Sequence, residues 1–191
     1  MIIETLVVGP IKTNCYIATD EKSRDSFIVD AGDNPAKIIG LVEGRLLSVK
    51  GIIATHGHFD HVTAVKALKD RFKAPFFMNP EDFPMLYDMG SPEVPLYDGL
   101  KLKAGGLEFK VIHTPGHTPG CVCLYSEKDG VLFSGDTLFY ADHGRCDLPE
   151  GSYPDMKNSL IKLFDLPDDT VVYPGHGRKT KIGDEKKRGL V

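Results

Sequence analysis

The sequence predicts an α/β protein (α+β in some classifications) built from two sheet-plus-helix layers that pack sheet against sheet. Strand-like runs are followed by helix-like segments, and this order occurs once in each half of the chain. The 191 residues are 41 % hydrophobic and 26 % charged, which is enough apolar material for a buried core. We therefore expect a single domain that spans residues 1–191.

In the first half, short apolar runs rich in β-branched residues predict strands. They cover residues 2–8, 15–19, 26–29, 51–54 and 75–78. Helical patterns cover residues 35–49, 61–72 and 80–89. Asn34 suits the N-cap of the first of these helices, and Pro35 suits its first helical position.

The second half begins again with strands. It follows a segment rich in proline and glycine, residues 90–106, which we expect to be an irregular connection. Strands are predicted over residues 107–113, 121–126, 131–134 and 170–173. Helices are predicted over residues 153–164 and 182–189, and the segment 138–151 is expected to be irregular.

Charge and hydropathy exclude several classes of partner. A net charge of −4 at pH 7 leaves no basic surface of the kind that binds nucleic acid or an anionic membrane. The apolar runs are of strand length, so no segment is long enough to span a bilayer, and no export signal opens the sequence. The four cysteines form no Cys-x-x-Cys pair and no disulfide framework. We expect a cytoplasmic monomer or small homo-oligomer that acts on a small molecule.

The densest group of potential metal ligands lies at residues 56–61, which read His-Gly-His-Phe-Asp-His. A strand end would place His56 and His58 on one side, and the first turn of the next helix would return Asp60 and His61 to the same place. One short segment can therefore serve two adjacent metal ions. A polar surface turn is the alternative, but chance does not readily provide four ligands in six residues.

Three further ligand candidates follow predicted strands and stand next to glycine. They are His117 in Gly-His-Thr, Asp136 in Gly-Asp and His176 in Pro-Gly-His-Gly. Glycine permits the sharp turns that present a short side chain from a strand end. Imidazole and carboxylate donors suit zinc and iron, with manganese as a further candidate.

These motifs resemble the metallo-β-lactamase superfamily, and within it the short bacterial and archaeal form of the glyoxalase II (hydroxyacylglutathione hydrolase) branch. The resemblance covers essentially the whole chain and rests on the four motifs in their order along the sequence. The segments Gly144-Arg145 and Asp147-Leu148-Pro149 support the placement in that branch. The resemblance implies an αββα four-layer sandwich with metal ions between the strand ends at one edge.

The resemblance also implies two sets of metal ligands that share one carboxylate. The first ion would be bound by His56, His58 and His117. The second ion would be bound by Asp60, His61 and His176, with Asp136 bridging the two. The cofactors would be two divalent ions per chain, for which we expect zinc, and Asp60 would also be catalytic because it orients the nucleophile.

The chemistry of such a pair of ions favours hydrolysis. Two ions about 3.5–4 Å apart can share a hydroxide, because metal binding lowers the pKa of water from about 15.7 to about 7. A thiolate leaves with little protonation, so a thioester needs no strong general acid. The resemblance implies hydrolysis of a thioester of the S-lactoylglutathione type, and it implies that Arg145 contacts the glutathione part.

The sequence departs from the larger members of this branch in one respect. They carry a C-terminal helical domain with further basic contacts to glutathione, and only a short segment follows His176 here. The basic residues at 178–181 either take over those contacts or form a solvated tail. Hydrolysis of another small ester or thioester is therefore an alternative.

Other activities of the same fold are rivals. A persulfide dioxygenase with one Fe(II) would share the motif at residues 56–61, whereas Pro-Gly-His-Gly favours a complete second site. A β-lactamase would carry a zinc-binding cysteine at the position of Asp136. Nucleases of the superfamily usually bring further domains or a basic surface. A metal-binding scaffold without activity would lack a ligand, and all seven are present.

Overall fold

The computed structural model describes residues 1–87 and 91–190, and two six-stranded sheets dominate it. The first sheet has the order β1-β2-β3-β4-β5-β6, with strands at Ile2–Val8, Thr13–Thr19, Asp25–Val29, Ser48–Ile53, Phe76–Met78 and Val94–Pro95. The second has the order β14-β13-β10-β9-β8-β7, with strands at Thr180–Lys181, Val171–Pro174, Val131–Gly135, Val122–Ser126, Leu107–His113 and Lys101–Ala104. A two-stranded ladder joins β11 (Leu138–Phe139) to β12 (Asp142–His143).

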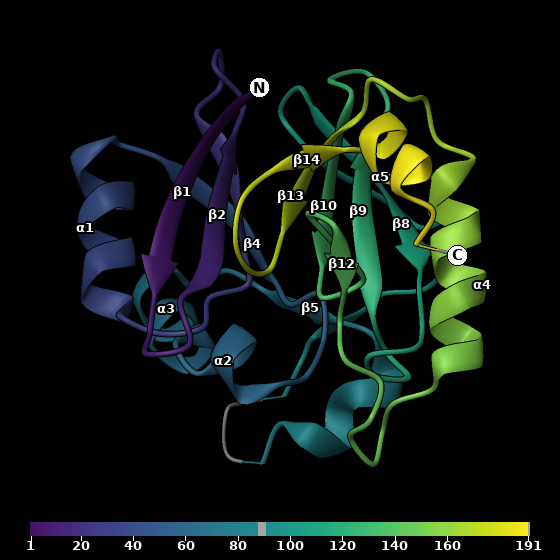
Figure 1. Ribbon diagram of the computed structural model, residues 1–191. Helices are drawn as coiled ribbons and strands as arrows, with labels where there is room; N and C mark the ends of the chain where they lie inside the picture. Colours follow the sequence, from purple (N-terminus) through teal and green to yellow (C-terminus); the bar gives the residue numbers. More distant parts are fainter. Residues whose placement is uncertain (88–90, 191) are drawn as a thin grey trace.

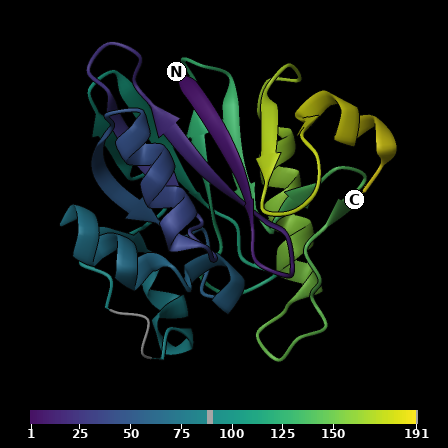
Figure 2. The ribbon, with the colours of Figure 1, turned by 90° about the vertical axis from the view of Figure 1, so that its left-hand side faces the viewer.

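Helices cover the outer faces of the two sheets (Figure 1). Helices α1 (Pro35–Gly44), α2 (Phe59–Val62) and α3 (Val65–Phe72) lie with the first sheet, and Figure 2 shows α1 lying across it. Helices α4 (Tyr153–Phe164) and α5 (Ile182–Arg188) lie with the second sheet. This confirms the predicted four-layer sandwich. None of the helices in the described ranges has the length and hydropathy that crossing a membrane requires.

Apolar side chains fill the three interfaces between the four layers. Ile38 of α1 is buried against the first sheet, and Leu160 of α4 is buried against the second. Between the sheets, the rings of Phe27 and Phe109 lie 6.1 Å apart. Full burial of one such side chain contributes about 1.5–3 kcal/mol, so these contacts hold the two halves together.

The first predicted helix is shorter than expected, although Asn34 is its N-cap and Pro35 begins it, as predicted. It ends at Gly44 rather than at residue 49, because Leu46 takes a left-handed conformation (φ 53°) and residues 48 onward pair with β3. Asn34 has a positive φ of 52° and its side chain makes no capping bond. Sheet pairing here outweighs the local helical pattern.

The second predicted helix starts earlier and is divided into α2 and α3. The amide of Ala64 donates to the carbonyl of Ala31, outside the helix, so the helical ladder is interrupted there. The predicted helix at residues 80–89 is a 3-10 helix over Pro80–Met85, and residues 88–89 lie outside the described ranges.

Two segments that were expected to be irregular contain strands. The segment 90–106 holds β6 and β7, and β7 pairs with β8 from Lys101 opposite Lys110. The segment 138–151 holds the short ladder of β11 and β12. Proline and glycine predicted loops here, but backbone pairing with neighbouring strands determines the conformation.

Candidate metal centre

The seven predicted ligands all follow strand ends at one edge of the sandwich. His56 and His58 come after β4, and Asp60 and His61 lie on α2, which begins directly after His58. The other three ligands come from the second sheet: His117 from the loop between β8 and β9, Asp136 after β10 and His176 after β13. Strands β3 and β4 are parallel, as are β10 and β13, so their carboxyl ends meet at the same edge.

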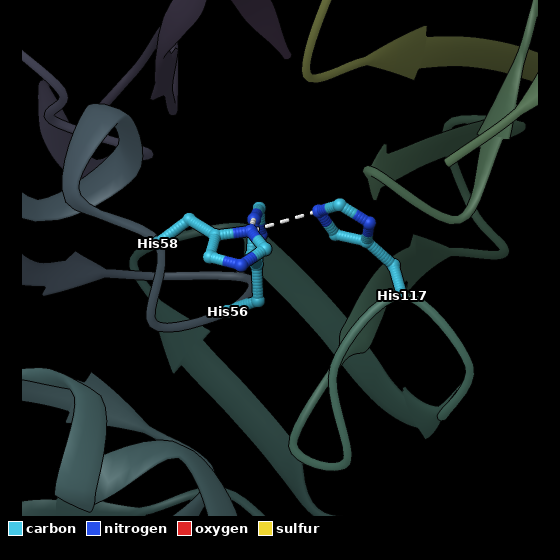
Figure 3. A group of neighbouring side chains, drawn as sticks. All are labelled: His56, His58 and His117. Carbon is cyan, nitrogen blue, oxygen red and sulfur yellow. Dashed lines mark hydrogen bonds between the residues drawn. The ribbon is translucent and has the colours of Figure 1, made fainter. Parts of the chain in front are cut away.

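The first ligand group consists of His56, His58 and His117, and their ring nitrogens point toward one another (Figure 3). His58 Nδ1 lies 3.1 Å from His56 Nε2 and 2.8 Å from His117 Nε2. Two of these side chains belong to the first sheet and one to the second. The group therefore spans the interface between the sheets.

The second ligand group consists of Asp60, His61 and His176. His61 Nε2 lies 3.4 Å from His176 Nε2. Asp60 Oδ2 lies 3.5 Å from His61 Nε2 and 3.2 Å from His176 Nε2. This group also combines side chains from both sheets.

Asp136 contacts both ligand groups. Its Oδ1 lies 3.4 Å from His61 Nε2, and its Oδ2 lies 3.5 Å from both His117 Nε2 and His176 Nε2. Oδ1 is buried and accepts no hydrogen bond from the described residues. An unsatisfied buried carboxylate oxygen is costly, so this atom points to a missing cationic partner.

The distances and donor types fit metal ions. Two ligand atoms bound at 2.0–2.1 Å to one tetrahedral ion lie about 3.3 Å apart. Five of the six pairs of ligand atoms within the two groups are 2.8–3.5 Å apart, and all the ligand atoms of each group lie within 4.8 Å of one another. Imidazole and carboxylate together suit zinc and iron.

Burial and neighbouring charges shift the pKa values of the ligands in opposite directions. Burial lowers the pKa values of His56 and His58, which leaves these rings neutral and able to donate a lone pair. Burial also lowers the pKa of His61, but the carboxylates of Asp136 and Asp30 outweigh it and raise this pKa to about 9. Burial raises the pKa of Asp60, but the bond with His176 and the charge of His61 outweigh this effect and hold the pKa below its usual range.

A contact that sequence reasoning missed orients His61. Asp30, buried at the end of β3, places Oδ2 3.2 Å from His61 Nδ1 and accepts bonds from Thr55 N at 2.8 Å and Thr55 Oγ1 at 2.9 Å. This ion pair, which lacks hydrogen-bond geometry, places a carboxylate on the Nδ1 side of the ring and leaves Nε2 facing the site. The available signal was an aspartate directly after an apolar strand. At nearby Gly32, a Cβ would overlap the carbonyl of Asp60, so only glycine fits.

Other side chains and backbone groups hold the remaining ligands. Thr13 Oγ1 donates to Asp60 Oδ2 at 2.8 Å, and His117 Nδ1 lies 2.7 Å from the carbonyl oxygen of Arg145. Asn14 Nδ2 donates to the carbonyl of Pro174 at 3.0 Å, which anchors the loop that carries His176. No local pattern in the sequence indicates these long-range contacts.

Arg145 lies beside the site, but its side chain is engaged elsewhere. The guanidinium forms two bonds of 2.7 Å with the carboxylate of Asp147 and is largely exposed. The two histidines outside the ligand set bond to backbone oxygens, His113 to Pro119 and His143 to Gly144. The structure thus brings together all seven predicted ligands and pairs the predicted substrate cation with a neighbouring acid.

Two pockets flank the ligand groups. One of about 340 Å³ lies beside His58, and its wall includes Phe59, Pro84 and Met85. The other, of about 370 Å³, lies beside His176, and its wall includes Arg178. A larger hollow of about 820 Å³ on the second sheet contains none of the ligands.

Comparison with known proteins shows which family shares this arrangement. The family model described as the metallo-β-lactamase superfamily matches residues 8–176. An uncharacterized protein of Aquifex aeolicus is 44 % identical over 97 % of this chain and 94 % of its own. Hydroxyacylglutathione hydrolase GloC of Haemophilus influenzae is 33 % identical over 98 % of this chain and 96 % of its own.

Solved structures agree in fold over nearly the whole chain. The B3 metallo-β-lactamase BLEG-1 superposes with a TM-score of 0.90 at 33 % identity, over 97 % of each chain. TTHA1623 in a di-iron-bound form gives 0.86 at 33 % identity, over 97 % of this chain and 98 % of its own. ETHE1 from Myxococcus xanthus gives a TM-score of 0.89 at 30 % identity, over 98 % of this chain and 83 % of its own. The chain therefore belongs to the metallo-β-lactamase superfamily of metal-dependent hydrolases, with relatives in its glyoxalase II-like branch.

Proposed function

We propose that the protein hydrolyses a thioester of the hydroxyacylglutathione type at a centre of two divalent ions. The observation that carries this proposal is the position of Asp136, whose two carboxylate oxygens contact histidines of both ligand groups. A shared carboxylate can hold two ions close enough together to act on one carbonyl. The relative named hydroxyacylglutathione hydrolase GloC supports this choice of substrate.

In this proposal Asp60 is both a ligand of the second ion and the hydrogen-bond acceptor that orients the attacking water. Two divalent ions, once bound, would supply a Lewis acid for the carbonyl oxygen and a water of lowered pKa. Asp60 stays ionised, because the bond with His176 and the charge of His61 hold its pKa low, and it can accept a hydrogen bond from the attacking water. The bond from Thr13 Oγ1 fixes the rotamer of this carboxylate.

The two flanking pockets suit the two ends of a thioester. The pocket beside His58 is walled by apolar side chains such as Phe59 and Met85, and it suits the acyl group. In the pocket beside His176, the Arg178 guanidinium lies 3.5 Å from the centre of the Tyr140 ring and forms no ion pair with the described residues. Such a guanidinium can bind a carboxylate of the thiol part with two parallel bonds.

Arg145 is a second proposed contact for the acidic thiol. To reach a substrate it would have to release Asp147, with which it forms two bonds. An exposed ion pair of this kind is weak, so a substrate carboxylate can compete for the guanidinium.

We further propose zinc as the resident ion and iron as the alternative, which the di-iron-bound form of TTHA1623 supports. All four cysteines are free, which fits a reducing compartment such as the cytoplasm. A monomer or small homo-oligomer with a small-molecule substrate is expected, and sedimentation analysis tests the oligomeric state.

One observation favours a second candidate function. His56, His61 and Asp136 also lie close enough together to bind one ion, and two histidines with a carboxylate are the donor set of mononuclear Fe(II) oxygenases. A persulfide dioxygenase is therefore the alternative.

Metal analysis combined with two assays decides between the candidates. The hydrolase proposal expects two ions per chain and release of free thiol from S-lactoylglutathione. One iron per chain together with oxygen uptake on a persulfide, and no thioester cleavage, would overturn it.

A further inference from the structure

A buried carboxylate stands behind the first ligand group. Asp82 lies in the 3-10 helix Pro80–Met85, which follows β5, and its side chain has no exposed surface. A buried carboxylate is tolerated only when its oxygens are bonded. Here both oxygens are bonded, and every donor comes from one of the two loops that carry His56, His58 and His117.

The bonds of Asp82 join these two loops directly. Oδ2 accepts from the amide of Gly57 at 2.9 Å and from Thr118 Oγ1 at 2.6 Å. Oδ1 accepts from the amide of Gly120 at 2.7 Å. Gly57 stands between two histidines of the first group, and Thr118 follows the third histidine, His117.

The packing around this carboxylate leaves little freedom. A Cβ on Gly120 would lie 2.6 Å from Asp82 Cγ, and one on Gly57 would lie 3.0 Å from the Asp82 carbonyl oxygen. Glycine at both positions thus lets the loops approach the carboxylate closely enough to bond.

The two loops belong to different sheets, so their separation depends on how the sheets pack. Metal–ligand bonds tolerate changes of only about 0.2 Å. We propose that Asp82 is a positioning residue that sets the separation of His58 and His117, and so the affinity of the first ligand group for its ion. The inference rests on the proposed two-ion centre.

The second ligand group is held by other contacts. Thr13 bonds to Asp60, Asp30 contacts His61, and Asn14 anchors the loop of His176. Loss of Asp82 should therefore affect one ion more than the other, which a general loss of stability would not do.

The test compares Asp82→Asn with Glu185→Gln. In Asp82→Asn an amide replaces one oxygen, so at least one of the amides of Gly57 and Gly120 faces another donor. Glu185 is an equally buried carboxylate that bonds to Thr180 and to the amide of Ala141, apart from the first group. Both variants lose stability, but only Asp82→Asn should lose affinity at the first group.

The measurement is a zinc titration against a chromophoric chelator, with the spectrum of the cobalt(II)-loaded protein as a second readout. We expect Asp82→Asn to bind one ion about ten- to hundred-fold more weakly and the other as before. The cobalt spectrum should change in Asp82→Asn and not in Glu185→Gln. Unchanged affinity in Asp82→Asn, or equal weakening of both ions, would overturn the inference.

Two further results keep the test decisive. If Asp82→Asn does not fold, Thr118→Val removes the bond to Asp82 at 2.6 Å together with the contact of Thr118 Oγ1 with Cys121 Sγ at 3.1 Å. It keeps the two amide bonds to Asp82 and should weaken the same ion by a smaller factor. An unchanged affinity in Thr118→Val would then refute the inference. If the unmodified protein takes up a single ion, the two-ion proposal fails, and the role of Asp82 is judged by the affinity of the first group for that ion.

Discussion

Removal of the Arg178 side chain should reduce activity on thioesters of acidic thiols and spare those of neutral thiols. The guanidinium rests on the ring of Tyr140 beside His176, and in the described ranges no carboxylate is paired with it. Asp142 lines the same pocket, but its Oδ1 accepts a bond from the amide of His143 at 2.8 Å. The donors of Arg178 are therefore available to a substrate.

The expected size of the effect follows from these contacts. A hydrogen-bonded contact between charged groups changes kcat/KM roughly ten- to hundred-fold. Arg145 must first give up two bonds of 2.7 Å to Asp147, which offsets part of the gain, so Arg145→Ala should have a smaller effect than Arg178→Ala. The loss in Arg178→Ala should appear mainly in KM, because the ligand groups are unchanged.

The assay uses two thioesters with the same acyl group, one of glutathione and one of an uncharged thiol. Lys179→Ala is the control for charge, since Lys179 lies over the ring of Tyr173 at 4.5 Å and does not line the pocket. Equal losses on both thioesters in Arg178→Ala would show that the residue supports the loop of His176 instead. A selective loss in Arg145→Ala alone would assign the contact to that residue.

Three more predictions concern the predicted metal ligands, Gly175 beside them, and the ion pair of Arg145 with Asp147. Asp136→Ala should lose both ions, whereas His176→Ala should lose mainly the second ion, as measured by metal content per chain. Two ions retained in His176→Ala would contradict the assignment. Gly175→Ala should lower both thermal stability and metal content, because a Cβ there would overlap Asp136 Oδ1. A normal metal content in that variant would show that the loop can shift. The bonds from Arg145 lower the pKa of Asp147 from 3.8 to about 2. The ion pair of Arg145 and Asp147 is therefore complete above pH 3.8 and is lost as the pH falls through about 2, where the carboxylate becomes protonated. NMR titration should find this pKa near its usual value in Arg145→Ala, and an unchanged value would refute the pairing in solution.

The residues of the candidate metal centre could be located from the sequence because each motif is local. Four potential ligands lie within residues 56–61, and the others stand beside glycine after apolar strands. The order of strands and helices along the chain could also be predicted, because the periodicity of apolar residues is a local signal. The exceptions were places where pairing with a distant segment decides the conformation, such as β7 in the proline-rich segment.

The supporting residues could not be predicted, because their role appears only in three dimensions. Asp82 stands in a polar stretch, Asn-Pro-Glu-Asp-Phe, that resembles an exposed helix start, yet it is fully buried by loops distant in the sequence. The break between α2 and α3 depends on the carbonyl of Ala31, which no local pattern identifies. The bonds between Arg145 and Asp147 are local, but sequence gave no reason to prefer them over a substrate contact.

Because both ligand groups draw side chains from the two sheets, binding of the proposed ions would be thermodynamically linked to folding. An ion at the second group would join His61 to His176, which are 115 residues apart, and so would close a long loop of the unfolded chain. In the chain-entropy description, a cross-link over a loop of that length contributes about 4.7 kcal/mol. With all four thiols free, the ions would be the cross-links of this protein, and chelation would act on it as reduction acts on a disulfide-bonded one.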